Sequence, residues 1–250
     1  MSTDERAATA AGTDSATSGG APSVEPVTHC LLMSGGLDST TLVAWVKENH
    51  PHDRFEGFTF LYGQKHAAEA EAAKAVAEFY GLQHFVIKLP TIHGSALTDG
   101  DVPLPEGRDL DAATGVAPSY VPARNLLFLA KMASIQDAYG PGVLWLGVHH
   151  DDYTGYPDCR PEFIAAADEA VRLGTRYQLR VRAPFVQWTK AAILEWGLEH
   201  GVPYDLTFSC YQGRRPACGV CDTCQARLAA FAAAGATDPI AYEQRPGDST

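Results

Sequence analysis

The stretch "LLMSGGLDSTTLV", residues 31–43, carries an apolar run into Ser34, Gly35 and Gly36 and then into a predicted helix. Glycines and hydroxyls between a strand and a helix are typical of an anion cradle, because backbone N–H groups and the positive end of the helix dipole converge there. The loop lacks the lysine of the ordinary nucleotide-triphosphatase motif, G-x-x-x-x-G-K-[ST]. The Asp38 carboxylate would repel a triphosphate that carries no metal ion, which indicates that Mg²⁺ lies between the two. The alternative is a tight turn in which glycine is merely tolerated.

Apolar runs alternate with amphipathic stretches along the rest of the chain. The strands are predicted at 29–33, 55–62, 84–89, 143–148 and 178–184, and the helices at 38–49, 65–80, 123–139, 161–173 and 189–200. Strands separated by helix-length segments predict an α/β fold with a doubly wound, mainly parallel sheet. Ligands bind at the carboxyl ends of such strands. The loops that follow the first and fourth strands are therefore expected to form one site.

The predicted domain organisation has four parts: a disordered tail over 1–26, an α/β domain over 27–206, a metal-binding knuckle with a helix over 207–236, and a flexible end over 237–250. The tail buries too little apolar surface to offset its chain entropy. It has no continuous hydrophobic block, so we expect neither a signal peptide nor a membrane span. Residues 91–119 interrupt the alternation with Gly, Pro and Asp. We expect a lid there, with a disordered insertion as the alternative.

The formal net charge of −11 results from 30 acidic and 19 basic side chains. An acidic chain lacks the attraction on which nonspecific nucleic-acid binding depends, so a small-molecule substrate is expected. The missing export signal and a tight cysteine cluster together predict a reducing, cytoplasmic location.

That cluster lies in "SCYQGRRPACGVCDTC", residues 209–224, and consists of Cys210, Cys218, Cys221 and Cys224. C-x-x-C turns present two thiolates at the angle that tetrahedral zinc requires. Four protein ligands leave no open coordination position, so the predicted zinc is structural. An iron–sulfur cluster and buried free thiols are the alternatives.

Two further stretches place polar groups at the same edge of the predicted sheet. In "YVPARNLLFL" (120–129), Arg124 opens a predicted helix and could offer its planar charge to phosphate oxygens. The alternative is ordinary capping with a surface arginine. In "LYGQKHAAEAE" (61–71), His66 and Glu69 are candidates for proton transfer, although a lone histidine is more often structural.

The loop after the fourth strand, "GVHHDDYTGYPDCRPEF" (147–163), contains Asp158, Arg160 and Glu162. A carboxylate can accept two hydrogen bonds from a guanine-like edge, and an arginine can bind a carboxylate substituent with two parallel bonds. These three residues are therefore predicted to bind a planar polar substrate. The alternative is a capped helix start with a salt bridge. Cys159 is expected to pack rather than to act as a nucleophile.

The loop "SGGLDST" resembles the signature of the PP-loop ATP pyrophosphatases, whose loop grips the β,γ-pyrophosphate while the α-phosphorus is attacked. Taken together, the motifs resemble the 7-cyano-7-deazaguanine synthases, the QueC family. The resemblance runs from about residue 31 to 231 and comprises, in order, "SGGLDST", "YGQKH", "VPARN", "GYPDCRPEF", "GVPYDLTFSCY" and "CGVCDTCQAR". The sequence "HHDD" at 149–152 departs from the small residues of the family pattern.

The resemblance implies a PP-loop (HUP-like, adenine nucleotide alpha hydrolase-like) fold with a C-terminal zinc knuckle. It implies an ATP-dependent ligase that converts 7-carboxy-7-deazaguanine and ammonia to the nitrile through adenylated acid and amide, on the way to queuosine. One zinc ion per chain, Mg·ATP as cosubstrate and a homodimer are also implied. The implied ATP-binding residues are Met33, Ser34, Gly35, Gly36, Leu37, Asp38, Ser39, Thr40, Thr41, Leu42 and Val43. The hypothesised catalytic residues are Asp38, Ser39, Arg124 and His66.

Two other functions are compatible with parts of the sequence. A PP-loop tRNA-modifying sulfurtransferase would pair this loop with reactive, separated thiols and a basic RNA surface. A zinc-ribbon interaction module would leave the polar loops of the sheet edge without a purpose. The sequence leaves open whether the nitrile serves tRNA, DNA or a nucleoside natural product, and where the ammonia comes from.

Overall fold

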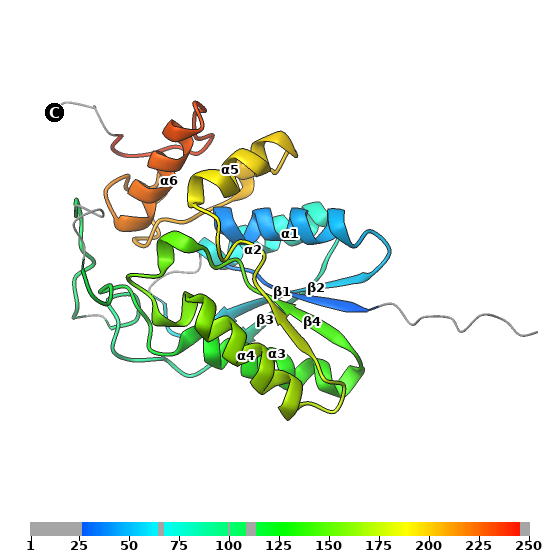
Figure 1. The fold of residues 1–250 in the computed structure, drawn as a ribbon. Coiled ribbons are helices and arrows are strands. Elements are labelled where there is room, and N and C mark those ends of the chain that lie inside the picture. The colour runs from blue at the N-terminus through cyan, green and yellow to red at the C-terminus, as the bar shows by residue number, and fades with distance from the viewer. Residues whose placement is uncertain (1–26, 65–67, 100, 109–113, 246–250) are drawn as a thin grey trace, which may run out of the picture.

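The computed structural model describes residues 27–64, 68–99, 101–108 and 114–245. Within them, five strands form one parallel sheet in the order β3-β2-β1-β4-β5 (Figure 1). The strands are β1 (Thr28–Leu32), β2 (Arg54–Leu61), β3 (Gln83–Lys88), β4 (Gly142–Trp145) and β5 (Arg180–Arg182). The chain order reverses at β1, so the carboxyl ends of β1 and β4 border the switch point at which ligands bind. The predicted doubly wound parallel sheet is confirmed.

Helices cover both faces of the sheet (Figure 1). One face carries α1 (Leu37–Asn49), α2 (Ala68–Tyr80) and α5 (Lys190–Glu199), and α6 (Asp222–Ala233) packs on α5. The other face carries α3 (Arg124–Tyr139) and α4 (Pro161–Gly174). Among the described residues, no helix is both long enough and apolar enough to span a bilayer.

The strands are apolar on both sides because helices cover both faces. On β1, Cys30 contacts the core that includes α3 and α4, whereas Leu31 contacts the core that includes α1 and α5. On β4, Leu144 and Trp145 divide between the two cores in the same way. Successive side chains of a strand point to opposite faces. A doubly covered strand therefore reads as a continuous apolar run in the sequence.

The strands predicted at 143–148 and 178–184 are shorter in the structure. The Leu146 N–H still donates to the Arg182 carbonyl oxygen at 2.9 Å. The chain then passes close to α1: a Cβ on Gly147 would lie 3.2 Å from the carbonyl oxygen of Asp38. The last residues of the predicted fourth strand therefore leave the sheet and face the ligand edge.

The chain end differs from the flexible segment predicted over 237–250. Asp238 is buried and accepts hydrogen bonds from Nε and Nη2 of Arg227 at 2.7 and 2.9 Å. The Tyr242 hydroxyl donates to the same carboxylate at 2.6 Å. A buried carboxylate is stable only with such partners. Up to residue 245 the chain end is therefore part of the knuckle, while 1–26 and 246–250 lie outside the described residues.

The described parts of 91–119 contain no regular helix or strand. The Ala96 N–H donates to the Pro118 carbonyl oxygen at 2.9 Å, which closes the segment on itself. Arg108 reaches the knuckle, where its Nε and Nη2 donate to the two carboxylate oxygens of Asp222 at 3.2 and 2.7 Å. The segment thus lies against the knuckle, and its role as a lid stays a prediction.

Candidate active site

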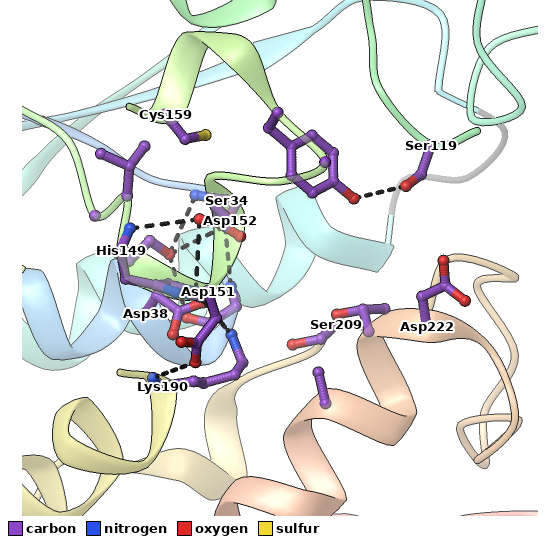
Figure 2. A pocket seen from close by; sticks show the side chains of 18 of the residues that line it. Ser34, Asp38, Ser119, His149, Asp151, Asp152, Cys159, Lys190, Ser209 and Asp222 are labelled. Carbon is purple, nitrogen blue, oxygen red and sulfur yellow. Dashed lines mark hydrogen bonds and ion pairs between the residues drawn. The ribbon is translucent and has the colours of Figure 1, made fainter. Parts of the chain in front are cut away.

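A cleft of about 810 Å³ opens at the carboxyl ends of the strands. Its walls come from the loops after β1, β2 and β4, from the first turns of α3 and α5, and from α6. Figure 2 shows Asp38, His149 and Lys190 grouped on one side, with Ser209 and Asp222 of the C-terminal part on the other. The loops after β1 and β4 thus face one cleft, as the sequence predicts.

The conformation of the loop after β1 requires a glycine at position 35, because the φ of Gly35, +79°, lies in the left-handed region that favours glycine. A Cβ there would lie 2.4 Å from both the Ala73 nitrogen and the Glu69 carbonyl oxygen. The loop therefore rests directly on the backbone of α2. Beyond it, the Ser34 N–H donates to Oγ of Ser39 at 3.3 Å. The helix α1 begins at Leu37, and its first N–H groups have no partner within the helix. This geometry suits the terminal phosphates of a nucleotide.

The residues predicted to bind ATP divide into two sets. The set that lines the cleft is Met33, Ser34, Gly36, Asp38 and Ser39. The set that shapes the loop and α1 from behind is Gly35, Leu37, Thr40, Thr41, Leu42 and Val43. The hydroxyl of Thr40 donates to the Gly36 carbonyl oxygen at 2.9 Å, and that of Thr41 donates to Leu37 at 2.9 Å. Direct ATP contact stays a prediction for all of them.

Lys190, at the start of α5, carries the charge that the loop itself lacks. Its Nζ lies 2.5 Å from Oδ2 of Asp38, and both side chains line the cleft. Burial alone would raise the pKa of Asp38, but the charges of Lys190 and His149 outweigh it and hold that pKa well below its usual range. Lys190 is not among the residues predicted from sequence. A lysine that opens the helix after the last strand is the signal that could have indicated it.

His149 is buried beside this pair. Its Nε2 lies 3.5 Å from Oδ2 of Asp152, 3.6 Å from Oδ2 of Asp38 and 3.4 Å from Nζ of Lys190. Burial would lower the pKa of His149, yet the two carboxylates outweigh burial and raise it. We call the group formed by Ser34, Asp38, Ser39 and Lys190 the phosphate centre; His149 lies beside this group and is not counted in it.

The phosphate centre also fits a divalent cation. Oδ1 of Asp38 is buried and has no hydrogen-bond partner within the described ranges. An unpaired carboxylate oxygen is the type of ligand that Mg²⁺ takes, together with phosphate oxygens and water. The residues present therefore fit a Mg²⁺ ion, which Asp38 would hold.

A second polar group lies on the other side of the loop and consists of Tyr62, Glu69 and Arg124, which we call the second centre. Nη1 of Arg124 donates to the Tyr62 hydroxyl at 3.2 Å. Burial raises the pKa of Glu69 to about 7, against the opposing charge of Arg124. All three line the cleft. The sequence predicts Arg124 and Glu69 at this edge, whereas Tyr62 is not singled out.

The residues predicted to bind the substrate lie elsewhere. Asp158 accepts the backbone N–H of Asn125 at 2.9 Å, and so caps the start of α3. Arg160 is exposed and donates through Nε to the Tyr153 carbonyl oxygen at 2.9 Å, and Glu162 is exposed on α4. None of the three is among the residues that line the cleft. Their role stays a prediction, and His66 lies outside the described residues.

The four clustered cysteines meet as the sequence predicts. Sγ atoms of Cys210, Cys218, Cys221 and Cys224 lie within 4.8 Å of one another, and all four residues are buried. Backbone N–H groups of Cys218 and Cys221 each donate to a sulfur of the cluster, Cys210 and Cys218 respectively, at 3.4 Å. Such bonds stabilise thiolates. The cluster can hold a metal ion, and its all-sulfur donor set fits zinc.

A parallel sheet with a glycine and hydroxyl loop after its first strand, a lysine facing that loop and a tetracysteine knuckle defines a PP-loop, adenine nucleotide alpha hydrolase-like enzyme class. Residues 28–235 match the family model "Queuosine biosynthesis protein QueC". The chain belongs to the QueC family, the 7-cyano-7-deazaguanine synthases, which are enzymes of the ligase class.

The alignments with curated relatives cover most of this chain and nearly the whole length of each relative. The 7-cyano-7-deazaguanine synthase of Acinetobacter baylyi is 42% identical over 85% of this chain and 93% of its own. That of Thermoplasma acidophilum is 41% identical over 86% and 92%, and that of a Cyanothece species is 44% identical over 85% and 98%. Among solved structures, the U34-tRNA thiolase NcsA of Methanococcus maripaludis aligns with 71% of this chain and 58% of its own, at a TM-score of 0.45 and 12% identity.

Proposed function

We propose that the cleft converts 7-carboxy-7-deazaguanine and ammonia into 7-cyano-7-deazaguanine (preQ0) at the expense of ATP, for queuosine or another 7-deazapurine product. The observation that carries the proposal is the Lys190 ammonium, which meets Asp38 in the first turn of α1. Together with the hydroxyls of Ser34 and Ser39, this group offers donors and positive charge to phosphates and a carboxylate to Mg²⁺. Membership of the QueC family supports 7-carboxy-7-deazaguanine as the acid that is activated.

The acid requires two activations. A carboxylate is a poor electrophile because its charge repels nucleophiles and oxide does not leave. Its attack on the α-phosphorus of ATP releases pyrophosphate and gives an acyl adenylate, from which ammonia displaces AMP to leave the primary amide and a proton. Attack of the amide oxygen on a second ATP again releases pyrophosphate. Loss of AMP and of the two amide protons then leaves the nitrile.

The phosphate centre supplies what both activations need. Lys190 and the free N–H groups of α1 would hold the outer phosphates and stabilise the charge that develops on the departing pyrophosphate. Ser34 and Ser39 would orient ATP through their hydroxyls. Mg²⁺ bound at Asp38 would neutralise part of the phosphate charge. His66 stays a candidate for proton transfer.

The products distinguish this proposal from other ATP-dependent reactions. The purified protein is incubated with ammonium and Mg·ATP, with and without 7-carboxy-7-deazaguanine. We expect AMP and pyrophosphate only when the acid is present, with two AMP for each nitrile. Formation of ADP without AMP would refute the mechanism, and AMP release that needs tRNA instead of the acid would favour a sulfurtransferase.

We also propose one structural zinc ion per chain, a cytoplasmic location and a homodimer. Zinc suits four clustered thiolates, which stay reduced in the cytoplasm. The remaining cysteines do not resemble sulfur carriers, since burial raises the pKa of both Cys30 and Cys159 far above the usual value. On the outer face of α3, Leu126 and Leu127 are 51% and 43% exposed, which supports self-association. Metal analysis tests the zinc ion, and sedimentation tests the homodimer.

A further inference from the structure

The two polar centres of the cleft lie on opposite sides of the loop after β1. In the phosphate centre, Lys190 follows β5, beside β4 in the sheet. In the second centre, Tyr62 follows β2, Glu69 lies in the first turn of α2, and Arg124 follows β3. The sheet order β3-β2-β1-β4-β5 therefore separates them. A triphosphate held on the β4 side leaves the second centre to the other reactant.

Arg124 in the second centre has the properties of an anion ligand. Its side chain is largely buried and lines the cleft, and no carboxylate of the described residues lies within ion-pair distance of it. The Tyr62 hydroxyl, 3.2 Å from Nη1, is the hydrogen-bond acceptor that the structure gives it. A guanidinium removed from water without an anionic partner is costly, whereas a bound carboxylate offers two parallel hydrogen bonds.

Glu69 provides the opposite chemistry. Its carboxylate lines the cleft and makes no hydrogen bond or ion pair with a residue in the described part of the chain. It is close enough to Arg124 for the two charges to interact. A carboxylate has two acceptor oxygens and therefore matches two adjacent N–H donors of a ligand.

We infer that the second centre determines substrate specificity: Arg124 binds the carboxylate of the acid, and Glu69 accepts hydrogen bonds from N1–H and the 2-amino group of its guanine edge. The inference rests on the proposed function, since it needs a substrate with both groups. Tyr62 keeps the guanidinium in place. This assignment replaces the predicted substrate residues Asp158, Arg160 and Glu162 with residues that line the cleft. It also gives Arg124 the organic acid as its ligand in place of the phosphates.

The guanine edge is tested by combining Glu69→Gln with an analogue of the acid that lacks the 2-amino group. Binding is measured by calorimetry without ATP. The wild type should bind the analogue about 10-fold to 100-fold more weakly than the acid, the usual effect of one lost hydrogen bond to a charged group. Glu69→Gln keeps one neutral acceptor oxygen, so it should discriminate between the acid and the analogue less strongly than the wild type does. If the variant still discriminates as well as the wild type, the assignment of Glu69 is wrong.

The carboxylate is tested by combining Arg124→Met with 7-deazaguanine, which lacks the acid group. The variant should lose about 100-fold in affinity for the acid and keep its affinity for 7-deazaguanine. Arg124→Lys, which keeps the charge but not the planar fork, should lose less. Weaker ATP binding with unchanged acid binding would overturn the assignment and return Arg124 to the phosphates.

The matched controls are Glu78→Gln and Arg172→Met. Glu78 is exposed near the end of α2, and Arg172 pairs with Glu169 on α4. Both should bind like the wild type, and unfolding midpoints and zinc content verify that every variant is folded.

The outcome also separates this inference from the function on which it rests. A wild type that makes AMP and nitrile while Glu69→Gln and Arg124→Met bind the acid normally refutes only the inference. A wild type that makes no AMP with the acid refutes the proposed function.

Discussion

At the scale of single residues, Lys190 provides a sharp test of the phosphate centre. Its ammonium is the cation beside Asp38, 2.5 Å away, so Lys190→Met removes the positive charge offered to the outer phosphates. We expect kcat/KM for ATP to fall by about 100-fold, as when one donor to a developing negative charge is lost. Lys74→Met is the matched control, because Lys74 is exposed on α2 and pairs with Glu78. Equal effects of the two substitutions would contradict the role of Lys190.

His29, at the opposite end of β1, has the tautomer of its neutral ring fixed by hydrogen bonds. Nε1 of Trp145 donates to Nδ1 at 2.9 Å, so the ring proton lies on Nε2, which is 2.9 Å from Oδ2 of Asp53. His29, His50 and Asp53 lie close enough to hold a metal ion. A metal-bound imidazole must donate from its other nitrogen, however, and the indole N–H can only donate. The three residues therefore form a hydrogen-bonded group and not a metal site.

This arrangement makes stability depend on pH. Burial lowers the pKa of His29 from the ordinary 6.5, against Asp53, which raises it, so the unfolded chain binds more protons than the folded one. Stability is then full above pH 6.5 and falls as the pH drops from there toward the folded-state pKa. Trp145→Phe frees Nδ1 to take a proton and should raise the pKa of His29.

We therefore expect Trp145→Phe to lower the free energy of unfolding at pH 8 and to reduce the further loss between pH 8 and pH 5.5. Urea denaturation at both pH values measures the two changes, and the difference between wild type and variant cancels the contributions of other titrating groups. An unchanged pH dependence would show that the indole does not set the protonation state of His29.

These residues also show where sequence reasoning succeeds at this scale. Ser34 to Ser39 and the cysteines of the knuckle sit in short contiguous motifs, so local spacing is enough to predict their grouping. Lys190 meets Asp38 across 152 positions of the chain, and no local pattern links them. Asp158 looks like a ligand in the sequence because its partner, the N–H of Asn125, lies 33 positions away. Pairings that the fold creates are invisible until the strand order is known.

At the scale of elements, the approach of the β1–α1 loop to α2 can be tested at adjacent glycines. Gly35→Ala would force a left-handed φ of +79° on alanine and place its Cβ 2.4 Å from the Ala73 nitrogen. We expect about 2–4 kcal/mol of destabilisation, from the left-handed conformation and the overlap together. Gly36→Ala is the matched control, since its φ is −83° and its Cβ would meet Oγ of Ser209 at 3.4 Å. Denaturant unfolding should show little change for Gly36→Ala, and an equal loss in both variants would contradict the close approach.

The helices and strands were predictable from the sequence because the spacing of apolar residues determines them. The residues at which they begin and end were not predictable in this way. The helix predicted at 123–139 is α3, but its first residues adopt an arrangement that no capping rule indicates. Ala123 has a φ of 51° and offers no side-chain cap, so Asp158 from the loop before α4 supplies one. That cap positions the first turn of α3, and therefore Arg124, in the cleft.

At the scale of the whole molecule, the buried pair of Arg227 and Asp238 ties the chain end to α6. Both side chains are almost completely buried, and Arg227 also donates to Oγ1 of Thr207 at 2.6 Å. Asp238→Ala would leave an unpaired buried guanidinium and should cost about 3–5 kcal/mol of stability. Glu243→Ala, which removes the partner of exposed Arg214, should change stability little. If urea unfolding shows equal losses, the chain end is not anchored through Asp238.

The cysteine cluster proposed to bind zinc connects the knuckle to the cleft. Asp222, next to Cys221, holds Arg108 of the 91–119 segment, and the following turns of α6 line the cleft. Metal binding contributes on the order of 10 kcal/mol to such small folds, which cannot build their own core. Removing the metal should therefore release α6 and Arg108 together while the sheet stays folded. The KM values for the acid and for ATP should rise, because one wall of the cleft is lost.

Hydrogen exchange on the chelated, reduced protein provides the direct measurement. Protection should disappear first in 207–245 and in 101–108, and persist in β1 and α1, whose core lies between the sheet and α5. Re-addition of zinc should restore both protection and KM. Cys224→Ser should reproduce the chelated state, whereas Cys30→Ala, which changes a buried thiol outside the cluster, should keep its metal. Loss of protection throughout the sheet at the same rate would contradict a separable knuckle, and unchanged KM values would contradict its place in the wall of the cleft.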